Sequence, residues 1–269
     1  MKHFRTFLWL IIATLMMNAV PADATTWEDA TGSYPIAVVA DIGPENGYYI
    51  YRPQVLTANT HPVAVFCVGS GSHPREYAPL LTSLASHGVV VIASTDPHQS
   101  DGAKATSGVD WLIDQNEMEK NEYYKKLIPS RVLAVGHSLG GNGAMMASTR
   151  SAKITSLLLY MPSAGNANAS ALSVPAFFIS GSLDGSVYPD AVKARYQQAT
   201  KANAWYGENA NQGHGGFGRN PSVQYYTRAW VYTQLFDDSG TARAAFYGPN
   251  WTFKDASTWK EVLKNNSAP

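Results

Sequence analysis

The fold is decided by the stretch Arg131-Val132-Leu133-Ala134-Val135-Gly136-His137-Ser138-Leu139-Gly140-Gly141-Asn142-Gly143. An apolar run leads into the pattern Gly-x-Ser-x-Gly, and the small residues at 144–148 predict a helix behind it. The order strand, sharp turn, helix is typical of a strained turn that exposes a serine hydroxyl above a parallel sheet. Gly136 and Gly140 suit this turn, because a Cβ at either position would crowd the neighbouring strand or helix.

Continuous apolar runs alternate with helical patterns on both sides of this stretch. Such runs indicate parallel strands that are covered on both faces. Two shorter runs around a Gly-Pro-Glu-Asn-Gly segment predict an antiparallel hairpin at one sheet edge. We therefore predict an α/β fold with a mostly parallel central sheet and helices on both faces. The expected strands are 35–39, 48–51, 62–68, 88–93, 154–160, 175–180 and 202–206, and the expected helices are 79–87, one around 109–113, 188–200 and 221–236.

The N-terminal segment has the pattern of a signal peptide. Lys2 and Arg5 precede an eleven-residue apolar run at 7–17, and Ala22-Asp23-Ala24 offers small residues for cleavage after Ala24. A membrane anchor is the alternative, but this run is too short for a hydrocarbon core of about 30 Å. We expect a secreted or periplasmic protein, with residues 25–269 as a single catalytic domain and no stable membrane insertion after cleavage.

Charge and cysteine content exclude several classes of function. Residues 1–24 hold two of the 20 basic residues and one of the 20 acidic residues, so the remaining chain has a net charge of −1. No basic footprint for nucleic acid is present. Cys67 is the only cysteine, which rules out an intramolecular disulfide, and its apolar strand predicts a buried core thiol.

A nucleophilic serine needs a base, and the base needs an orienting carboxylate. The order in this type of fold is serine, then acid, then histidine. His214 is the only histidine after Ser138, and it lies in a glycine-rich loop. Asp184 follows the end of an apolar strand, where sites form in parallel sheets. Asp190 is the second candidate for the acid, although a predicted helix starts there.

Acyl transfer at a serine also needs N–H donors for the developing oxyanion. The backbone N–H of Leu139, directly after the serine, is one expected donor. The second should come from the Gly69-Ser70-Gly71-Ser72 loop after the strand at 62–68. We favour the N–H of Ser70, and Gly71 remains an alternative.

These motifs resemble those of exported α/β-hydrolases in the dienelactone hydrolase and bacterial cutinase group, which includes PET-hydrolase-like enzymes. The resemblance covers residues 60–245 and rests on Gly69-Ser70, on Leu84-Ala85-Ser86-His87-Gly88-Val89-Val90, on Gly136 to Gly141, and on Asp184 and His214 in the same order. It implies an α/β-hydrolase fold, a Ser138-Asp184-His214 triad, and an oxyanion hole from the N–H groups of Ser70 and Leu139. The implied activity is hydrolysis of carboxylic esters without a cofactor.

The chain departs from the polyester-cleaving members of this group at three places. The aromatic residue expected beside Ser70 is a serine here, and the tryptophan that follows the strand after the serine turn is replaced near Ser163. No cysteine is available for their C-terminal disulfide. Trp205, Tyr206 or Phe217 could supply an aromatic surface instead. The connection at 161–174 is too short for an inserted lid domain, so we expect an open site.

Two groups of alternatives stay open at this point. The same triad supports acyl transfer to an alcohol or cleavage of an amide, and a binding module could retain the hydrolase fold. His73, Asp96 and His98 are spaced too irregularly for a strong metal site. We expect an ester substrate that is a small molecule, a lipid or a polymer, and no cofactor or metal.

Overall fold

The computed structural model describes residues 26–265, 267 and 268. The predicted signal peptide and its cleavage point after Ala24 lie outside the described residues. None of the helices within residues 26–265 is long and apolar enough to cross a bilayer.

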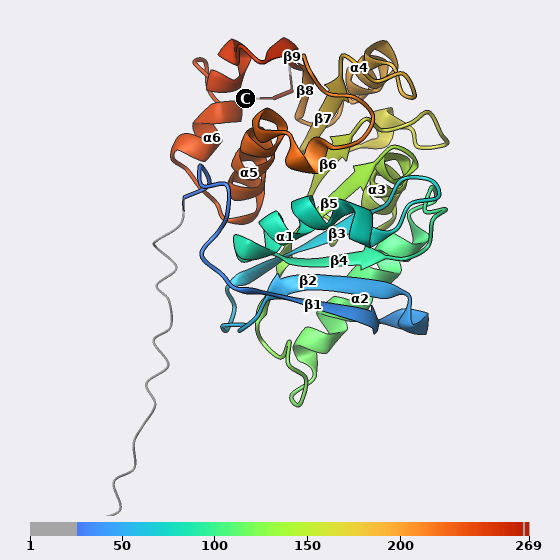
Figure 1. Cartoon of the computed structure of the whole chain (residues 1–269), viewed down its shortest axis with the longest axis vertical. Helices are drawn as coiled ribbons and strands as arrows, with labels where there is room; N and C mark the ends of the chain where they lie inside the picture. Colours follow the sequence, from blue (N-terminus) through green and yellow to red (C-terminus); the bar gives the residue numbers. More distant parts are fainter. Residues whose placement is uncertain (1–25, 266, 269) are drawn as a thin grey trace, which may run out of the picture.

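A nine-stranded sheet forms the centre of the described chain (Figure 1). The strands from β4 to β8 in spatial order run parallel, whereas β1, β2 and β9 are antiparallel to their neighbours. The predicted mostly parallel sheet and the N-terminal edge hairpin are confirmed. In spatial order the strands are β1 (Ile36–Ile42), β2 (Tyr48–Pro53), β4 (Val90–Ser94), β3 (His61–Cys67), β5 (Leu127–His137), β6 (Ser156–Tyr160), β7 (Ala176–Gly181), β8 (Ala204–Asn209) and β9 (Trp259–Lys264).

Helices cover both faces of this sheet. Figure 1 shows α1, α5 and α6 on one face, and α2, α3 and α4 on the other. The helices are α1 (Ala78–Ser86), α2 (Ala103–Glu117), α3 (Leu139–Arg150), α4 (Pro189–Gln198), α5 (Pro221–Leu235) and α6 (Thr241–Phe246). Short 3-10 helices are η1 (Pro44–Asn46), η2 (Pro74–Tyr77), η3 (Ala169–Ala171), η4 (Phe217–Arg219) and η5 (Thr252–Asp255).

Burial explains why the central strands have continuous apolar sequences. Every residue of β3, β4, β6 and β7 is buried, so both faces of these strands contact helices. Cys67 at the end of β3 is fully buried, and burial raises the pKa of its thiol to about 12. It is a core residue, as predicted.

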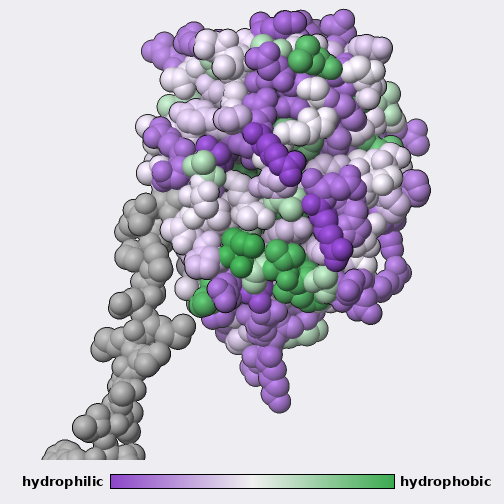
Figure 2. All heavy atoms as spheres, viewed as in Figure 1, coloured by the Kyte–Doolittle hydropathy of each residue, from purple (hydrophilic) through white to green (hydrophobic). Residues whose placement is uncertain are grey.

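In Figure 2 the hydrophobic residues on the visible face gather mainly over the β1–β2 edge, and most of that face is hydrophilic.

The structure differs from the sequence-based expectation in four elements. Helix α3 begins at Leu139, five residues before the predicted 144–148 segment. Glycine has a poor helix propensity, but the first turns of α3 pack so closely against neighbouring segments that glycines are required there. Strand β8 continues to Asn209 through polar residues. Helix α6 and strand β9 were not predicted, and β9 closes the sheet as an antiparallel edge strand.

Candidate active site

Ser138 occupies the sharp turn between β5 and α3. Its backbone angles are φ 54° and ψ −121°, in a region that non-glycine residues rarely adopt. A Cβ on Gly136 would lie 2.2 Å from the carbonyl oxygen of Gly140, and a Cβ on Gly140 would lie 2.1 Å from that of Cys67. Only glycine fits at these two positions, so the neighbouring backbones can close tightly enough to force the turn.

Main-chain hydrogen bonds hold this turn against the next strand. The N–H of Ser138 donates to the carbonyl oxygen of Tyr160 over 3.0 Å, and the N–H of Ser163 donates to that of Ser138 over 2.9 Å. The serine is therefore fixed to β6 as well as to its own strand. Ser138 is half-buried and so remains partly accessible to solvent.

Asp184 and His214 meet at the same edge of the sheet. Asp184 follows β7, His214 lies in the loop after β8, and Nδ1 of His214 is 2.7 Å from Oδ2 of Asp184. The other oxygen of Asp184 accepts the N–H groups of Ser186 and Val187 over 2.8 and 2.9 Å. Because a carboxylate accepts at both oxygens, Nδ1 of His214 is the donor and its Nε2 is left as a proton acceptor.

Asp190, the second candidate for the acid, is not the residue that contacts His214. Asp190 lies in the first turn of α4, where a negative charge stabilises the helix. The side chain of Asp184 is fully buried, whereas that of His214 is 27% exposed. Asp184 is therefore the acid that contacts His214.

The loop after β3 contains two N–H groups that could face a bound oxyanion. The N–H of Gly71 already donates to the carbonyl oxygen of Pro97 over 3.2 Å. In the described part of the chain, the N–H of Ser70 has no hydrogen-bond partner. Leu139 is the first residue of α3, where N–H groups have no acceptor within the helix. Since Gly140 touches the end of β3, the loop with Ser70 lies close to Leu139.

A family model described as PET hydrolase-like matches residues 20–262. The chain belongs to the PET hydrolase-like family. A search of curated protein sequences found no match. Membership agrees with the mostly parallel sheet and places the chain among ester hydrolases of the α/β-hydrolase type.

The three aromatic residues considered as a substrate surface in this PET hydrolase-like chain fall into two groups. Trp205 and Tyr206 are fully buried in β8, and Nε1 of Trp205 donates to the carbonyl oxygen of Phe246. They are core residues, so they cannot form a substrate surface. Phe217 is also buried, but it stacks on Tyr160 at 4.2 Å between ring centres and lines a cavity beside His214.

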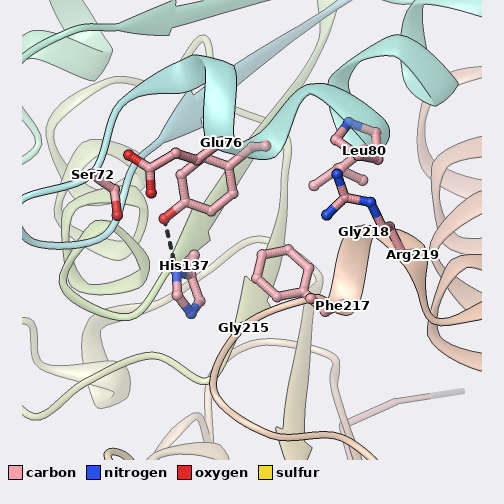
Figure 3. Close-up of a pocket in the computed structure, with 11 residues that line it drawn as sticks. Ser72, Glu76, Leu80, His137, Gly215, Phe217, Gly218 and Arg219 are labelled. Carbon is pink, nitrogen blue, oxygen red and sulfur yellow. Dashed lines mark hydrogen bonds between the residues drawn. The ribbon is translucent and has the colours of Figure 1, made fainter.

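This cavity has a volume of about 210 Å³ and lies between α1 and the loop that carries His214. Figure 3 shows Phe217 between His137 and Arg219, with Glu76 and Ser72 on the side of the loop after β3. The cavity wall is apolar at Phe217 and charged at the exposed residues Glu76 and Arg219. The wall includes His137 and Gly215, which are the chain neighbours of Ser138 and His214, so the cavity could receive part of an ester.

The residues considered for a metal have other partners. Nδ1 of His73 accepts the N–H of Arg75, and Oδ1 of Asp96 accepts the N–H of His98. Among residues 26–265, 267 and 268, no group of three or more His, Cys, Asp or Glu side chains is arranged to hold a metal ion.

Sequence reasoning missed two side chains next to this site. His137 and Tyr77 form hydrogen bonds that connect the loop after β3 with the main chain of His214. His137 is the residue before Ser138 in the sequence, whereas Tyr77 is 60 residues away from His137 and carries no motif. Only the position of His137 inside Gly-x-Ser-x-Gly could have drawn attention to it.

Proposed function

We propose that this chain is an exported serine carboxylic-ester hydrolase that works through an acyl-enzyme on Ser138. The observation that carries the proposal is the 2.7 Å hydrogen bond between His214 and the buried Asp184, whose other oxygen accepts two main-chain N–H groups. It gives the imidazole one defined tautomer. The loop with His214 is bonded to His137, the residue before the serine on the strained turn. Membership of the PET hydrolase-like family supports an ester as the substrate.

The first half of the reaction acylates the serine. Nε2 of His214 takes the proton of Ser138 as the serine oxygen bonds to the ester carbonyl carbon. The carbonyl oxygen becomes an oxyanion, which accepts hydrogen bonds from the N–H groups of Ser70 and Leu139. The C–O bond to the alcohol then breaks, and the alcohol leaves with the proton from Nε2.

The second half releases the acid. A water molecule gives a proton to Nε2 of His214 and attacks the acyl carbon, which produces a second oxyanion in the same place. Its collapse breaks the bond to Ser138, and the serine recovers its proton. Asp184 stabilises the imidazolium in both halves by accepting the Nδ1 proton in a hydrogen bond.

Within the described part of the chain the site has no lid domain over it, so it can accept substrates of different sizes. The connection from β6 to β7 spans residues 161–175 and holds only η3, which is too small to form a lid domain. We propose a cutinase-like or esterase-like enzyme with an open site, in which residues 25–269 form the catalytic domain. Export rests on the sequence of residues 1–24.

The test is hydrolysis of p-nitrophenyl esters of short acids by the wild type, by Ser138→Ala and by Ser148→Ala. Ser148 lies on α3, and its hydroxyl donates to the carbonyl oxygen of Met145 within that helix. We expect release of p-nitrophenol by the wild type and Ser148→Ala, and loss of turnover by at least about a thousandfold in Ser138→Ala. Equal rates for Ser138→Ala and the wild type would refute the proposal.

Product analysis separates hydrolysis from transfer. In the presence of a competing alcohol, a hydrolase releases mainly the free acid, whereas an acyltransferase forms mainly the new ester. No turnover of any ester by the folded wild type would favour a binding protein with a retained hydrolase fold.

A further inference from the structure

Tyr77 and His137 connect two parts of the site through hydrogen bonds whose directions are fixed by chemistry. The N–H of Gly69 can only donate, so Oη of Tyr77 accepts from it over 3.0 Å. The carbonyl oxygen of His214 can only accept, so Nε2 of His137 carries a proton and donates over 2.7 Å. A neutral imidazole then has an unprotonated Nδ1, which accepts the hydroxyl proton of Tyr77 over 2.9 Å.

Burial keeps both side chains in the states that these bonds require. His137 is 7% exposed, and its burial, together with the nearby His214, lowers the pKa of the His137 imidazole to about 4. Tyr77 is 8% exposed, and burial raises the pKa of its phenol. At neutral pH the imidazole is uncharged and the phenol is protonated, so each bond has one donor and one acceptor.

The connected groups are those whose relative positions matter most for catalysis at a serine. Gly69 precedes Ser70, a proposed oxyanion donor, and His137 precedes Ser138. At the other end, the bond from His137 holds the carbonyl group of the catalytic histidine itself, and the two imidazole rings lie 4.7 Å apart between centres. The dashed line at His137 in Figure 3 marks its bond with Tyr77.

A second set of bonds holds the same loop but has a different effect. Nε2 of Gln212 donates to the carbonyl oxygens of Gly213 and Gly215, on either side of His214. Because Gln212 belongs to this loop, these bonds shape the loop without fixing it to the serine. The bond from His137 sets the loop against the turn that carries Ser138.

We propose that Tyr77 is a positioning residue, which holds the oxyanion loop directly at Gly69 and the catalytic histidine loop through His137, so that both stay in register with Ser138. This inference rests on the proposed serine esterase function. It predicts that the hydroxyl of Tyr77 affects the rate of the chemical step although it does not touch the reacting atoms.

The main test compares Tyr77→Phe with Tyr48→Phe. Both changes remove the hydroxyl of a buried tyrosine and keep the ring. Oη of Tyr48, on β2, donates to the carbonyl oxygen of Lys104, on α2, over 2.9 Å and, among the described residues, has no bond with the loops that carry Ser70 and His214. We expect Tyr77→Phe to lower kcat about tenfold to a hundredfold, because small misplacement of catalytic groups is that costly. KM should change little, since the ring still lines the cavity. Tyr48→Phe should retain the wild-type kcat.

A double-mutant cycle tests whether Tyr77 acts through His137. His137→Phe removes both bonds of the imidazole and leaves Tyr77 only its bond with Gly69, so adding Tyr77→Phe should lower kcat by a much smaller factor than it does in the wild type. Independent, multiplicative losses in the double variant would overturn the proposal. So would a kcat for Tyr77→Phe that matches those of Tyr48→Phe and the wild type.

The tautomer of His137 can be measured without a substrate. Imidazole nitrogen chemical shifts from NMR at neutral pH should show a protonated Nε2 and an unprotonated Nδ1 for this residue. A protonated Nδ1 would overturn the network whatever the activity. If the expected tautomer is found in a wild type that hydrolyses no ester, the network stands and the proposed function fails.

Discussion

The bond between Asp184 and His214 determines which imidazole nitrogen can act as a base. Asp184 has no freedom to rotate, because its second oxygen accepts two main-chain N–H groups. Its first oxygen must then face Nδ1 of His214, which leaves Nε2 unprotonated in the neutral ring. In the proposed reaction, the charge of the carboxylate would also stabilise the imidazolium that forms.

Replacing Asp184 by asparagine should reverse this tautomer. The side-chain amide that Asp184→Asn introduces can donate to Nδ1 of His214, so the proton moves to Nε2 and the base is lost. We expect kcat for a p-nitrophenyl ester to fall about ten-thousandfold, as in other triads. Asp190→Asn, which alters only the first turn of α4, should retain kcat within about twofold. Similar losses for both variants would contradict this role of Asp184.

Single residues differ in how well the sequence reveals them. Ser138 and His214 could be named because a turn motif and a unique histidine identify them, and Asp184 because it follows a strand end. Tyr77 could not, since its importance depends on the fold bringing η2 against β5. Trp205 and Tyr206 were candidate surface residues, yet an aromatic residue near a loop gives no indication of which way its strand faces.

The contact between α3 and β3 shows how one element depends on another. Gly140 lies in the first turn of α3, where alanine would ordinarily favour the helix by up to about 1 kcal/mol. Here a Cβ would lie 2.1 Å from the carbonyl oxygen of Cys67 and 2.4 Å from that of Val68. Both are backbone atoms of the strand end, so neither can rotate away.

Gly140→Ala should therefore destabilise the protein by about 1–3 kcal/mol or more instead of stabilising it. Urea unfolding followed by circular dichroism measures the change in the free energy of unfolding. Gly185→Ala is the matched control, since a Cβ there meets no atom within 4 Å. It should alter stability by less than about 0.5 kcal/mol. A Gly140→Ala variant as stable as the wild type would show that α3 can shift away from β3.

Strands buried on both faces were predictable, whereas the edge strand β9 and the short helix α6 were not. Strands β3, β4, β6 and β7 have continuous apolar runs because helices cover both faces. Strand β9 (Trp259–Lys264) lies at an edge, is mostly half-buried and carries two lysines and a glutamate, so its pattern resembles a solvated loop. Helix α6 has only six residues, too few for a periodic signal.

Buried histidines link the stability of the whole molecule to pH. His87 and His137 are 4% and 7% exposed, and burial lowers the pKa of each to about 4 from an ordinary value of 6.5. Burial also lowers the pKa of His61. In the unfolded chain these side chains take up protons below pH 6.5, whereas in the folded chain His87 and His137 do so only near pH 4. Unfolding is therefore favoured as the pH falls between these values.

The free energy of unfolding should be lower at pH 4.5 than at pH 7, by at most roughly 3 kcal/mol for each of His87 and His137. Urea unfolding at the two pH values measures this difference. His87→Gln, which removes one buried imidazole, should reduce the difference, while His98→Gln on an exposed loop should not. Equal stability of the wild type at both pH values would contradict the burial of these imidazoles in neutral form.

The central claim concerns the reactivity of one hydroxyl in the complete protein. It is tested most directly by treating the folded chain with a fluorophosphonate and locating the adduct by mass spectrometry of its peptides. Our account predicts a single adduct on Ser138, which disappears in Ser138→Ala and forms much more slowly in Asp184→Asn. The absence of an adduct on the folded wild type, or labelling that persists in Ser138→Ala, would contradict it.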